Sequence, residues 1–278
     1  MKTFAAFAAP SCALLATLLF PFASAGGTVA PQVQALLDQM TLAEKIGQMT
    51  QVDSDALKQH PDDVQKLFLG SVLSGGNSNP ADNSAATWRK HAAQFQERAL
   101  KTRLQIPLLY GIDAVHGHNN VLGAVVFPHN IGLGATRNPA LIEKAARITA
   151  TEIAATSMHW ACAPCVAVVQ NVRWGRSYES FSSDPVLVGQ LGAAANRGFQ
   201  AALPGGFQVL ACTKHFAGDG GTKNGVDQGD TQGDEATLRK LHLAPYADAM
   251  PVQSSRIRRS SSCCTDGSKL RVSPVMTT

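Results

Sequence analysis

The stretch Ile106-Pro-Leu-Leu-Tyr-Gly-Ile-Asp113 is almost continuously apolar and ends on a carboxylate. Strands that are buried on both faces of a parallel sheet have this unbroken hydrophobicity, whereas half-exposed strands alternate apolar and polar residues. The sequence therefore predicts a buried strand over Ile106–Ile112. Phe207–Thr213 repeats the pattern further along the chain and ends on Lys214-His215.

Helical stretches alternate with apolar strands on both sides of these two segments. Thr41-Leu42-Ala43-Glu44 has the pattern of a capping box at the start of one helix, and Asn138 precedes another that runs to about Thr156. Alternation at this spacing predicts a parallel sheet whose strands are joined by crossover helices. The remaining predicted helices are Pro31–Met40, Asp62–Leu69, Ala85–Thr102, Asp184–Gln200 and Asp234–Met250, and the remaining strands are Ser71–Leu73 and Trp160–Val169.

Polar residues at the strand ends distinguish between the two folds that such a sheet can form. A doubly wound sheet more often has a glycine-rich first turn, and Gly132-Leu133-Gly134 does not qualify because no helix opens directly on it. Asp113, Arg176 and Lys214-His215 fall just past the C-terminal ends of successive strands, as in the catalytic face of a barrel enzyme. The sequence thus predicts an α/β protein with a (β/α)8 TIM-type barrel, incomplete because only four or five of eight units are recognisable.

The N-terminus has the pattern of an export signal. An apolar run, Ala13–Phe22, precedes the small-residue site Ala23-Ser24-Ala25, so residues 1–25 are expected to be a signal peptide. A buried N-terminal helix is the alternative, and it is disfavoured because Gly26-Gly27 follow at once. The run is too short to span a bilayer, so we expect a periplasmic or extracellular protein.

Residues 26–250 are expected to form the partial barrel domain, and residues 251–278 differ from them in character. Ser and Arg dominate from Pro251 onward, without a helical or strand period. A disordered natural tail is one explanation. A shifted reading frame or premature stop is favoured, because a parallel barrel halted midway leaves an unpaired strand edge.

The net charge of +4 comes entirely from that tail. Residues 1–250 are formally neutral, because the tail holds five basic residues against the single acid Asp266. A nucleic-acid or anionic-membrane partner therefore has no support from the predicted domain.

Two motifs could bind a metal or carry redox chemistry, and neither is expected to do so. Cys162 and Cys165 form a C-x-x-C pair, but no helix begins behind it, so a role as core or strand-end cysteines is favoured. His116 and His118 form an H-x-H pair without further clustered ligands, which favours a structural or loop role. No metal and no organic cofactor is expected.

Four motifs, in order and at fitting spacing, resemble the β-glucosidase branch of glycoside hydrolase family three. They are Met40–Met49 (MTLAEKIGQM), Gly111–Gly117 (GIDAVHG), Arg173–Glu179 (RWGRSYE) and Lys214–Gly221 (KHFAGDGG). The resemblance implies that Asp113 accepts hydrogen bonds from the hydroxyls of one terminal sugar, and that Arg176, Lys214 and His215 bind the remaining hydroxyls. The chemistry suits these residue types, because a carboxylate can accept from two vicinal hydroxyls while charged donors make strong hydrogen bonds opposite.

Other roles remain open for each of these residues. Asp113 could cap a helix, and Arg176 could be the structural ion-pair partner of Glu179 or Asp184. Lys214-His215 are harder to explain structurally, since adjacent polar residues that end an apolar strand must be paired if they are buried. Trp174 could stack on a sugar face or simply pack in the core.

The resemblance also implies a retaining mechanism in which an Asp attacks the anomeric carbon and a Glu serves as acid and base. The family nucleophile lies in a Ser-Asp-Trp-like motif, which these residues lack, and Asp266 in Cys-Thr-Asp-Gly does not match it. The expected protein is therefore the sugar-binding part of an exo-acting β-glucosidase that takes a β-glucoside or oligosaccharide and does not turn it over alone. The alternatives are a β-N-acetylglucosaminidase, disfavoured because no His follows in Gly218–Thr222, and a non-catalytic sugar-binding protein.

Overall fold

The structure is a computed structural model that describes residues 30–249. The predicted signal peptide and the tail 251–278 lie outside the described residues. The chain divides into two compact units after Gln39, so α1 (Pro31–Gln39) is described by itself. The predicted helix Pro31–Met40 is confirmed by α1, which ends one residue earlier. Everything that follows concerns the second unit, from Met40 onward.

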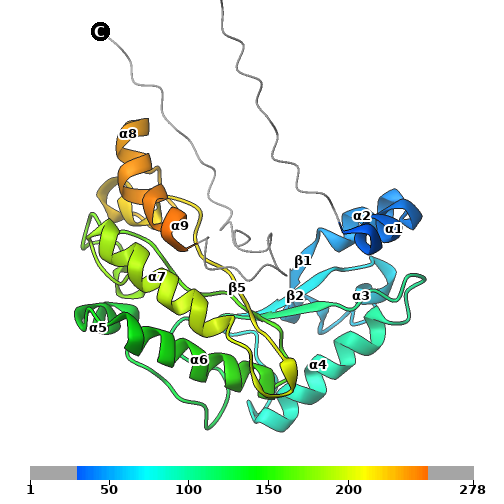
Figure 1. The fold of residues 1–278 in the computed structure, drawn as a ribbon. Helices are drawn as coiled ribbons and strands as arrows, with labels where there is room; N and C mark the ends of the chain where they lie inside the picture. The colour runs from blue at the N-terminus through cyan, green and yellow to red at the C-terminus, as the bar shows by residue number, and fades with distance from the viewer. Residues whose placement is uncertain (1–29, 250–278) are drawn as a thin grey trace, which may run out of the picture. The chain divides into compact units, whose positions relative to one another are not determined.

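Five short parallel strands form one sheet in the order β1-β2-β3-β4-β5 (Figure 1). Each strand pairs with the next strand along the chain, and the register aligns Val72 with Tyr110 and Trp160 with Leu210. A sheet in which every neighbour is the next parallel strand requires a crossover at each step, which is the βαβ pattern of a barrel. The strands are β1 (Gln51–Asp53), β2 (Ser71–Ser74), β3 (Leu109–Ile112), β4 (Trp160–Ala161) and β5 (Leu210–Ala211).

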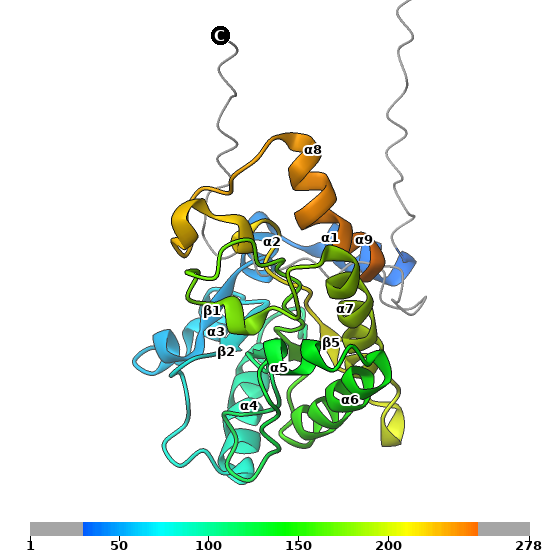
Figure 2. The ribbon, with the colours of Figure 1, turned by 90° about the vertical axis from the view of Figure 1, so that its left-hand side faces the viewer.

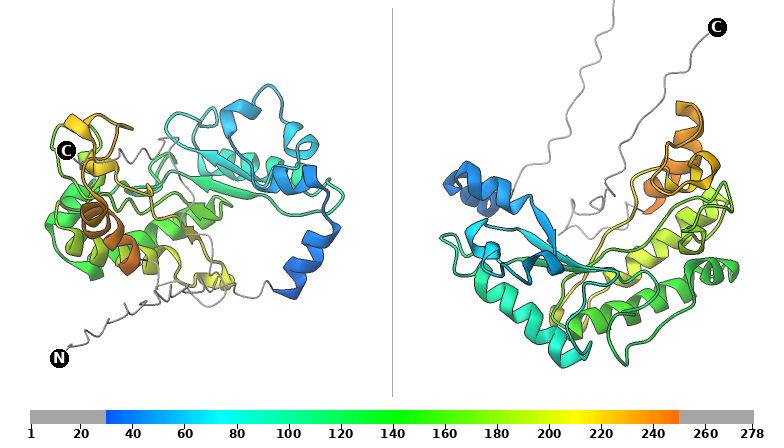
Figure 3. Two further views of the ribbon diagram at one scale, coloured as in Figure 1. Left: turned by 90° about the horizontal axis from the view of Figure 1, so that it is seen from above. Right: turned by 180° about the vertical axis from the view of Figure 1, so that it is seen from behind.

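The longest crossover helices lie along one face of the sheet (Figures 1 and 3). They are α4 (Ala85–Ala99), α6 (Pro139–Ala155) and α7 (Pro185–Phe199). Their buried side chains join those of the strands in one apolar core, which includes Trp88, Phe95, Tyr110, Ile112, Ile153 and Leu191. A smaller cluster of Trp160, Cys162 and Cys212 packs with Leu73 and Leu210.

The helix caps read from the sequence are present. Thr41 Oγ1 accepts a hydrogen bond from the backbone N–H of Glu44, whose carboxylate accepts in return from the Thr41 N–H, so the capping box of α2 (Leu42–Gln48) is confirmed. Asn138 caps α6 as predicted, and Asp184, which was predicted as the first residue of a helix, caps α7. These side chains satisfy backbone donors that the first turn of a helix leaves unpaired.

The predicted strand Trp160–Val169 is wrong in length, because only its first two residues belong to β4. Pro164 has no N–H to donate to a ladder, so regular pairing stops there. The chain nevertheless continues beside β5, since the Lys214 N–H donates to the Pro164 carbonyl at 2.9 Å and the Val166 N–H donates to the Lys214 carbonyl at 2.8 Å. These hydrogen bonds hold Cys165 next to Lys214.

The last predicted helix, Asp234–Met250, is not one continuous α-helix in its described part. It consists of α8 (Glu235–Thr237), a π-helical segment (Leu238–Leu243) and α9 (Ala244–Ala249), and α9 packs against α7 (Figure 2). Pro245 cannot donate the hydrogen bond that an uninterrupted α-helix needs at that position, which accounts for the irregular turn before it.

Two elements, β1 and α5 (Asn130–Ala135), were not predicted from the sequence. The remaining helical elements are α3 (Asp63–Lys66) and short 3-10 turns at Ser54–Leu57, Ser177–Glu179, Pro204–Gly206, Asp219–Gly221 and Lys223–Gly225. Two of these turns, Ser177–Glu179 and Asp219–Gly221, carry the polar side chains of the site.

Candidate functional site

Asp113 and Lys214 form an ion pair at the carboxyl ends of the strands. Asp113 directly follows β3, and its backbone N–H donates to the Ser74 carbonyl at the end of β2. Lys214 lies a few residues past β5, and its Nζ donates to Asp113 Oδ1. The Lys214 side chain is 4 % exposed, whereas that of Asp113 is 36 % exposed. The lysine is therefore buried behind a carboxylate that still reaches the surface.

The charge on Lys214 depends on this partner. Burial by itself disfavours an ammonium group, because the charge loses its hydration. The charge and the hydrogen bond of the Asp113 carboxylate act against that effect, and the pKa of Lys214 is raised above its ordinary value. Lys214 is therefore charged at neutral pH.

Arg176 and His215 form a second group of polar contacts. The Arg176 guanidinium donates to both carboxylate oxygens of Glu179, each at 2.8 Å, and these bonds raise its pKa. Arg176 Nη2 also lies 2.9 Å from His215 Nε2, and His215 Nδ1 lies 2.9 Å from Asp219 Oδ2. Four charged or polar side chains thus form one chain from Glu179 to Asp219.

This series of hydrogen bonds determines which ring nitrogen of a neutral His215 carries the proton. Arg176 can only donate, so His215 Nε2 must accept, and the single proton of a neutral imidazole must sit on Nδ1. Asp219 then accepts that proton's hydrogen bond. Asp219 is therefore the residue that orients His215.

The two groups occupy the same neighbourhood. Burial raises the pKa of Tyr178, and the charges of both Glu179 and Asp113 add to that increase. Burial also raises the pKa of the Cys165 thiol, with contributions from Asp219 and Glu179, while the nearby Lys214 opposes it. Tyr178 and Cys165 thus lie within electrostatic reach of both groups.

A polar hollow of about 160 Å³ opens beside Asp113. This volume is roughly ten times what one water molecule requires, so the hollow has room for a small polar ligand. Two aromatic contacts line one side, with ring centroids 4.1 Å apart for His116–His129 and 4.6 Å for His129–Tyr178. The hollow is lined by Gly76, Asp113, Val115, His116, Asn119, Asn120, His129, Tyr178 and Glu179. Arg176, Lys214 and His215 do not line this hollow.

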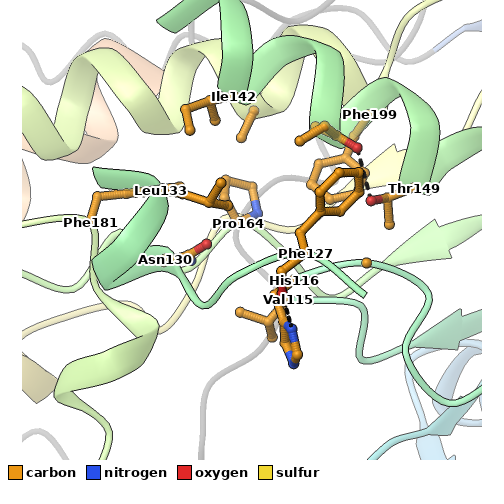
Figure 4. A pocket seen from close by; sticks show the side chains of 14 residues that line it. Val115, His116, Phe127, Asn130, Leu133, Ile142, Thr149, Pro164, Phe181 and Phe199 are labelled. Carbon is orange, nitrogen blue, oxygen red and sulfur yellow. Dashed lines mark hydrogen bonds between the residues drawn. The ribbon is translucent and has the colours of Figure 1, made fainter. Parts of the chain in front are cut away.

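An apolar pocket of about 30 Å³ lies behind the hollow, and Val115 and His116 line both (Figure 4). Phe127, Leu133, Ile142, Phe181 and Phe199 supply large apolar side chains to its lining. The His116 Nδ1 contact with the Phe127 carbonyl, 2.9 Å long, spans its edge (Figure 4). Residues of α6 and α7 also line the pocket, and it is too small for a sugar.

The structure decides several alternatives that the sequence left open. Trp174 is 1 % exposed and its Nε1 donates to Asp227, so it packs in the core. His118 is fully buried against Thr156, and burial lowers its pKa to about 4, which is a structural role. Cys162 and Cys165 are both buried and form no disulfide with each other. Arg176 pairs with Glu179, one of the two ion-pair partners that the sequence offered for it. The other, Asp184, caps α7.

Four residues of this region were not assigned roles from the sequence: Glu179 as a site residue, Asp219, Tyr178 and His129. Glu179 and Asp219 stand inside the quoted motifs, each close in sequence to an assigned residue, so motif position could have indicated them. Cys165, His215 and Asp219 also bring together three side chains whose ligand atoms all lie within 4.8 Å of one another, which is close enough to share a metal ion.

Within residues 30–249, no helix combines the length and the apolar character that crossing a bilayer demands.

The comparisons with known proteins agree with this geometry. The model of the glycosyl hydrolase family 3 N terminal domain matches residues 41–272. A lysosomal beta glucosidase of Dictyostelium discoideum is 33 % identical over 241 residues, which cover 78 % of this chain and 29 % of that protein. This chain therefore spans less than a third of that relative's length.

Two solved structures are also similar. The exo-1,3/1,4-beta-glucanase from a Pseudoalteromonas species superimposes with a TM-score of 0.73 at 43 % identity, over 78 % of this chain and 28 % of that one. A beta-glucosidase from Listeria innocua in complex with glucose superimposes with a TM-score of 0.67 at 29 % identity, over 80 % of this chain and 31 % of that one. The sheet order, the matched motifs and these likenesses agree: the chain belongs to glycosyl hydrolase family 3 and contains its TIM-barrel-like N-terminal domain.

Proposed function

We propose that residues 26–250 form the glycone-binding part of an exo-acting, retaining β-glucosidase. The observation that carries the proposal is the partly exposed Asp113 carboxylate, held by the buried Lys214 and facing a polar hollow. Similar proteins include two beta-glucosidases and an exo-1,3/1,4-beta-glucanase. The substrate would be a β-glucoside or oligosaccharide that presents one terminal glucosyl residue.

The proposed binding mode follows from hydrogen-bond capacity. Asp113 accepts from two neighbouring hydroxyls of the pyranose, because a carboxylate has several lone pairs and Lys214 occupies only one side of it. Arg176, Lys214 and His215 supply donors and an acceptor for the other hydroxyls. Arg176, Lys214 and His215 must move their side chains toward the hollow to do so, since none of the three lines it.

The two catalytic carboxyl groups of a retaining glycosidase are not assigned to any residue here. The 278 residues contain no Ser-Asp-Trp motif like that of the family nucleophile. In such a mechanism one carboxylate attacks the anomeric carbon and the other acts as acid and base. We therefore propose that these residues bind the glycone and that the 278-residue chain does not hydrolyse the glycosidic bond by itself.

Export belongs to the same proposal. A relative from Salmonella typhimurium, 27 % identical over 227 residues, is a periplasmic beta-glucosidase. Together with the signal-like residues 1–25, this supports a periplasmic or extracellular location, where β-glucosides are available to an exo-acting enzyme.

Calorimetric titration of the 278-residue chain with glucose tests the proposal. Glucose should bind, and Asp113→Asn should weaken binding strongly, because the amide can no longer accept from two hydroxyls at once. Asp62→Asn is the matched control, since Asp62 is exposed and lies outside the hollow. A chain that folds cooperatively and does not bind glucose would contradict the proposal, and so would turnover of an aryl β-glucoside by that chain alone.

A second candidate is a β-xylosidase, because one relative of 32 % identity over 169 residues bears that name. Xylose lacks the hydroxymethyl group of glucose. Titration with xylose beside glucose distinguishes the two, and tighter binding of xylose would favour the second candidate.

A further inference from the structure

Cys165, His215 and Asp219 converge at one point beside the sugar-binding residues. One ligand atom from each lies within 4.8 Å of the other two. Cys165 is fully buried, and the side chains of His215 and Asp219 are 11 % and 17 % exposed. A thiolate, an imidazole and a carboxylate are the three ligand types that zinc prefers in proteins. Rigid, largely buried ligands of these types are suited to holding such an ion.

Asp219 has binding capacity that the protein does not use. Its Oδ2 accepts from His215 Nδ1, while its Oδ1 is buried and meets no hydrogen-bond partner among the described residues. A buried carboxylate oxygen without a partner is costly, because it has lost its water without a replacement. A cation beside it would remove that cost.

The local charge also leaves room for a divalent cation. Asp113, Glu179, Asp219 and Asp227 carry four negative charges in this neighbourhood, against the two positive charges of Lys214 and Arg176. A divalent ion that displaces the Cys165 thiol proton therefore reduces the net negative charge from two to one. The thiol pKa is high in the absence of a metal, so the proton must be displaced by the ion itself.

We propose that Cys165 Sγ, His215 Nδ1 and Asp219 form a three-ligand site for a divalent ion of the zinc type. The ion would take the place of the Nδ1 proton between His215 and Asp219, which are 2.9 Å apart. One proton leaves for solvent, from the Cys165 thiol. The other proton stays on the imidazole and moves from Nδ1 to Nε2.

That proton movement couples the ion to the sugar-binding residues. With the proton on Nε2, His215 presents an N–H to Arg176 Nη2 instead of an acceptor, and the 2.9 Å hydrogen bond between them is lost. His215 and Arg176 then separate. If the proposed function holds, bound metal therefore weakens glucose binding.

The sequence did not reveal this site because its ligands do not follow any compact metal-binding spacing. Cys165 lies after β4 and His215 after β5, and only the parallel pairing of those segments brings them together. The H-x-H pair, which a search for metal motifs does find, has His118 bonded to Thr156 and outside the cluster.

Titration with Co²⁺ tests the site directly, because a cobalt–thiolate bond produces a charge-transfer absorption in the near ultraviolet. The samples carry no histidine tag, and Cys263 and Cys264 are replaced by serine in every one so that their thiols do not contribute. The reference protein is the chain with only these two replacements. The reference protein should show the band, Cys165→Ser should abolish it, and Cys162→Ser should retain it. Cys162 is the matched control, since it is also buried, three residues away, and outside the cluster.

Zinc competition against cobalt gives the affinities. Cys165→Ser should weaken zinc binding by at least about tenfold, because the loss of a residue that only supports a metal ligand already costs about that much. Absence of the band from the reference protein, or an unchanged band in Cys165→Ser, would overturn the proposal.

Glucose titration with and without Zn²⁺ tests the coupling. Zinc should weaken glucose binding in the reference protein and in Cys162→Ser, and should have little effect in Cys165→Ser. If the cobalt band is present but zinc leaves glucose binding unchanged, the coupling is wrong and the metal site stands. If glucose does not bind even without metal, the proposed function fails, and the cobalt result still decides the metal site.

Discussion

Lys214 Nζ donates to Asp113 Oδ1 across 101 residues of sequence, which joins the chain beyond β5 to the chain beyond β3. The two partners differ in burial, since the lysine side chain is 4 % exposed and the carboxylate is 36 % exposed. This asymmetry has a consequence for stability. Removing the carboxylate leaves a buried cation without a counter-charge, whereas removing the lysine leaves a carboxylate that water can reach.

Asp113→Asn should therefore destabilise the fold more than Lys214→Met. We expect Asp113→Asn to lower the free energy of unfolding by about 3 kcal/mol, the lower end of the range for breaking a buried ion pair. Lys214→Met should cost less, because Asp113 regains hydration. Urea denaturation of both variants measures the difference. A larger loss for Lys214→Met would show that the lysine is not the residue that depends on its partner.

Asp219→Asn should weaken glucose binding without unfolding the protein. The amide can donate to His215 Nδ1, which favours the tautomer that no longer accepts from Arg176. We expect an effect of about 1 kcal/mol, equivalent to roughly fivefold in affinity, typical of one hydrogen bond. Calorimetry measures it, with Asp230→Asn, an acid nearby in the sequence, as the control. Equal affinities in the two variants would remove Asp219 from the site.

The Glu44–Arg103 pair should make stability depend on acid pH. Hydrogen bonds from Arg103 and from the Thr41 backbone lower the pKa of Glu44 from 4.5 to about 2. The folded state thus binds the proton less readily than the unfolded state does. The stabilisation is present above pH 4.5 and is lost as the pH falls toward 2.

Denaturation between about pH 5 and pH 2 measures this contribution. Glu44→Gln should be less stable than the wild type at about pH 6, and the difference should shrink as the pH is lowered. Glu143→Gln, in a pair with Arg197 whose side chains are 44 % and 43 % exposed, is the control and should change little. A difference between Glu44→Gln and wild type that grows toward low pH would have the wrong sign.

Gly220→Ala should destabilise the turn that carries Asp219. A Cβ at Gly220 would overlap the Val168 carbonyl oxygen, so the backbone must shift. We expect a loss of about 1–3 kcal/mol, the usual effect of overpacking. Gly175→Ala is the control, since a Cβ there meets no atom within 4 Å. Thermal melts that show equal stability for both variants would contradict the close packing of this turn.

Local signals in the sequence predicted the helices and the order of the strands well. Caps at Thr41, Asn138 and Asp184 depend on neighbouring residues alone, so a local pattern can identify them. β1 was missed because Gln51-Val-Asp53 is short and mostly polar. α5 was missed because it contains two glycines, which are poor helix formers. One of them, Gly134, is needed for close packing, because a Cβ there would overlap the Phe181 carbonyl oxygen.

The assignments that failed depend on long-range contacts. Arg176 was expected directly at a strand end, but β4 stops at Ala161 and Arg176 lies far along the following loop, where Glu179 holds it. Asp219 orients His215 because, in the folded protein, His215 lies between Asp219 and Arg176. Arg176–Glu179 and His215–Asp219 are local contacts, three and four residues apart, but the Arg176–His215 contact that joins them spans 39 residues, so no local pattern encodes it.

A crystal structure of the 278-residue chain with glucose bound would show where the sugar lies. We expect one glucose molecule in the polar hollow, with Asp113 accepting from two of its hydroxyls and with Arg176, Lys214 and His215 contacting the same ring. Glucose bound elsewhere, or in the hollow without any contact to Asp113, would contradict it.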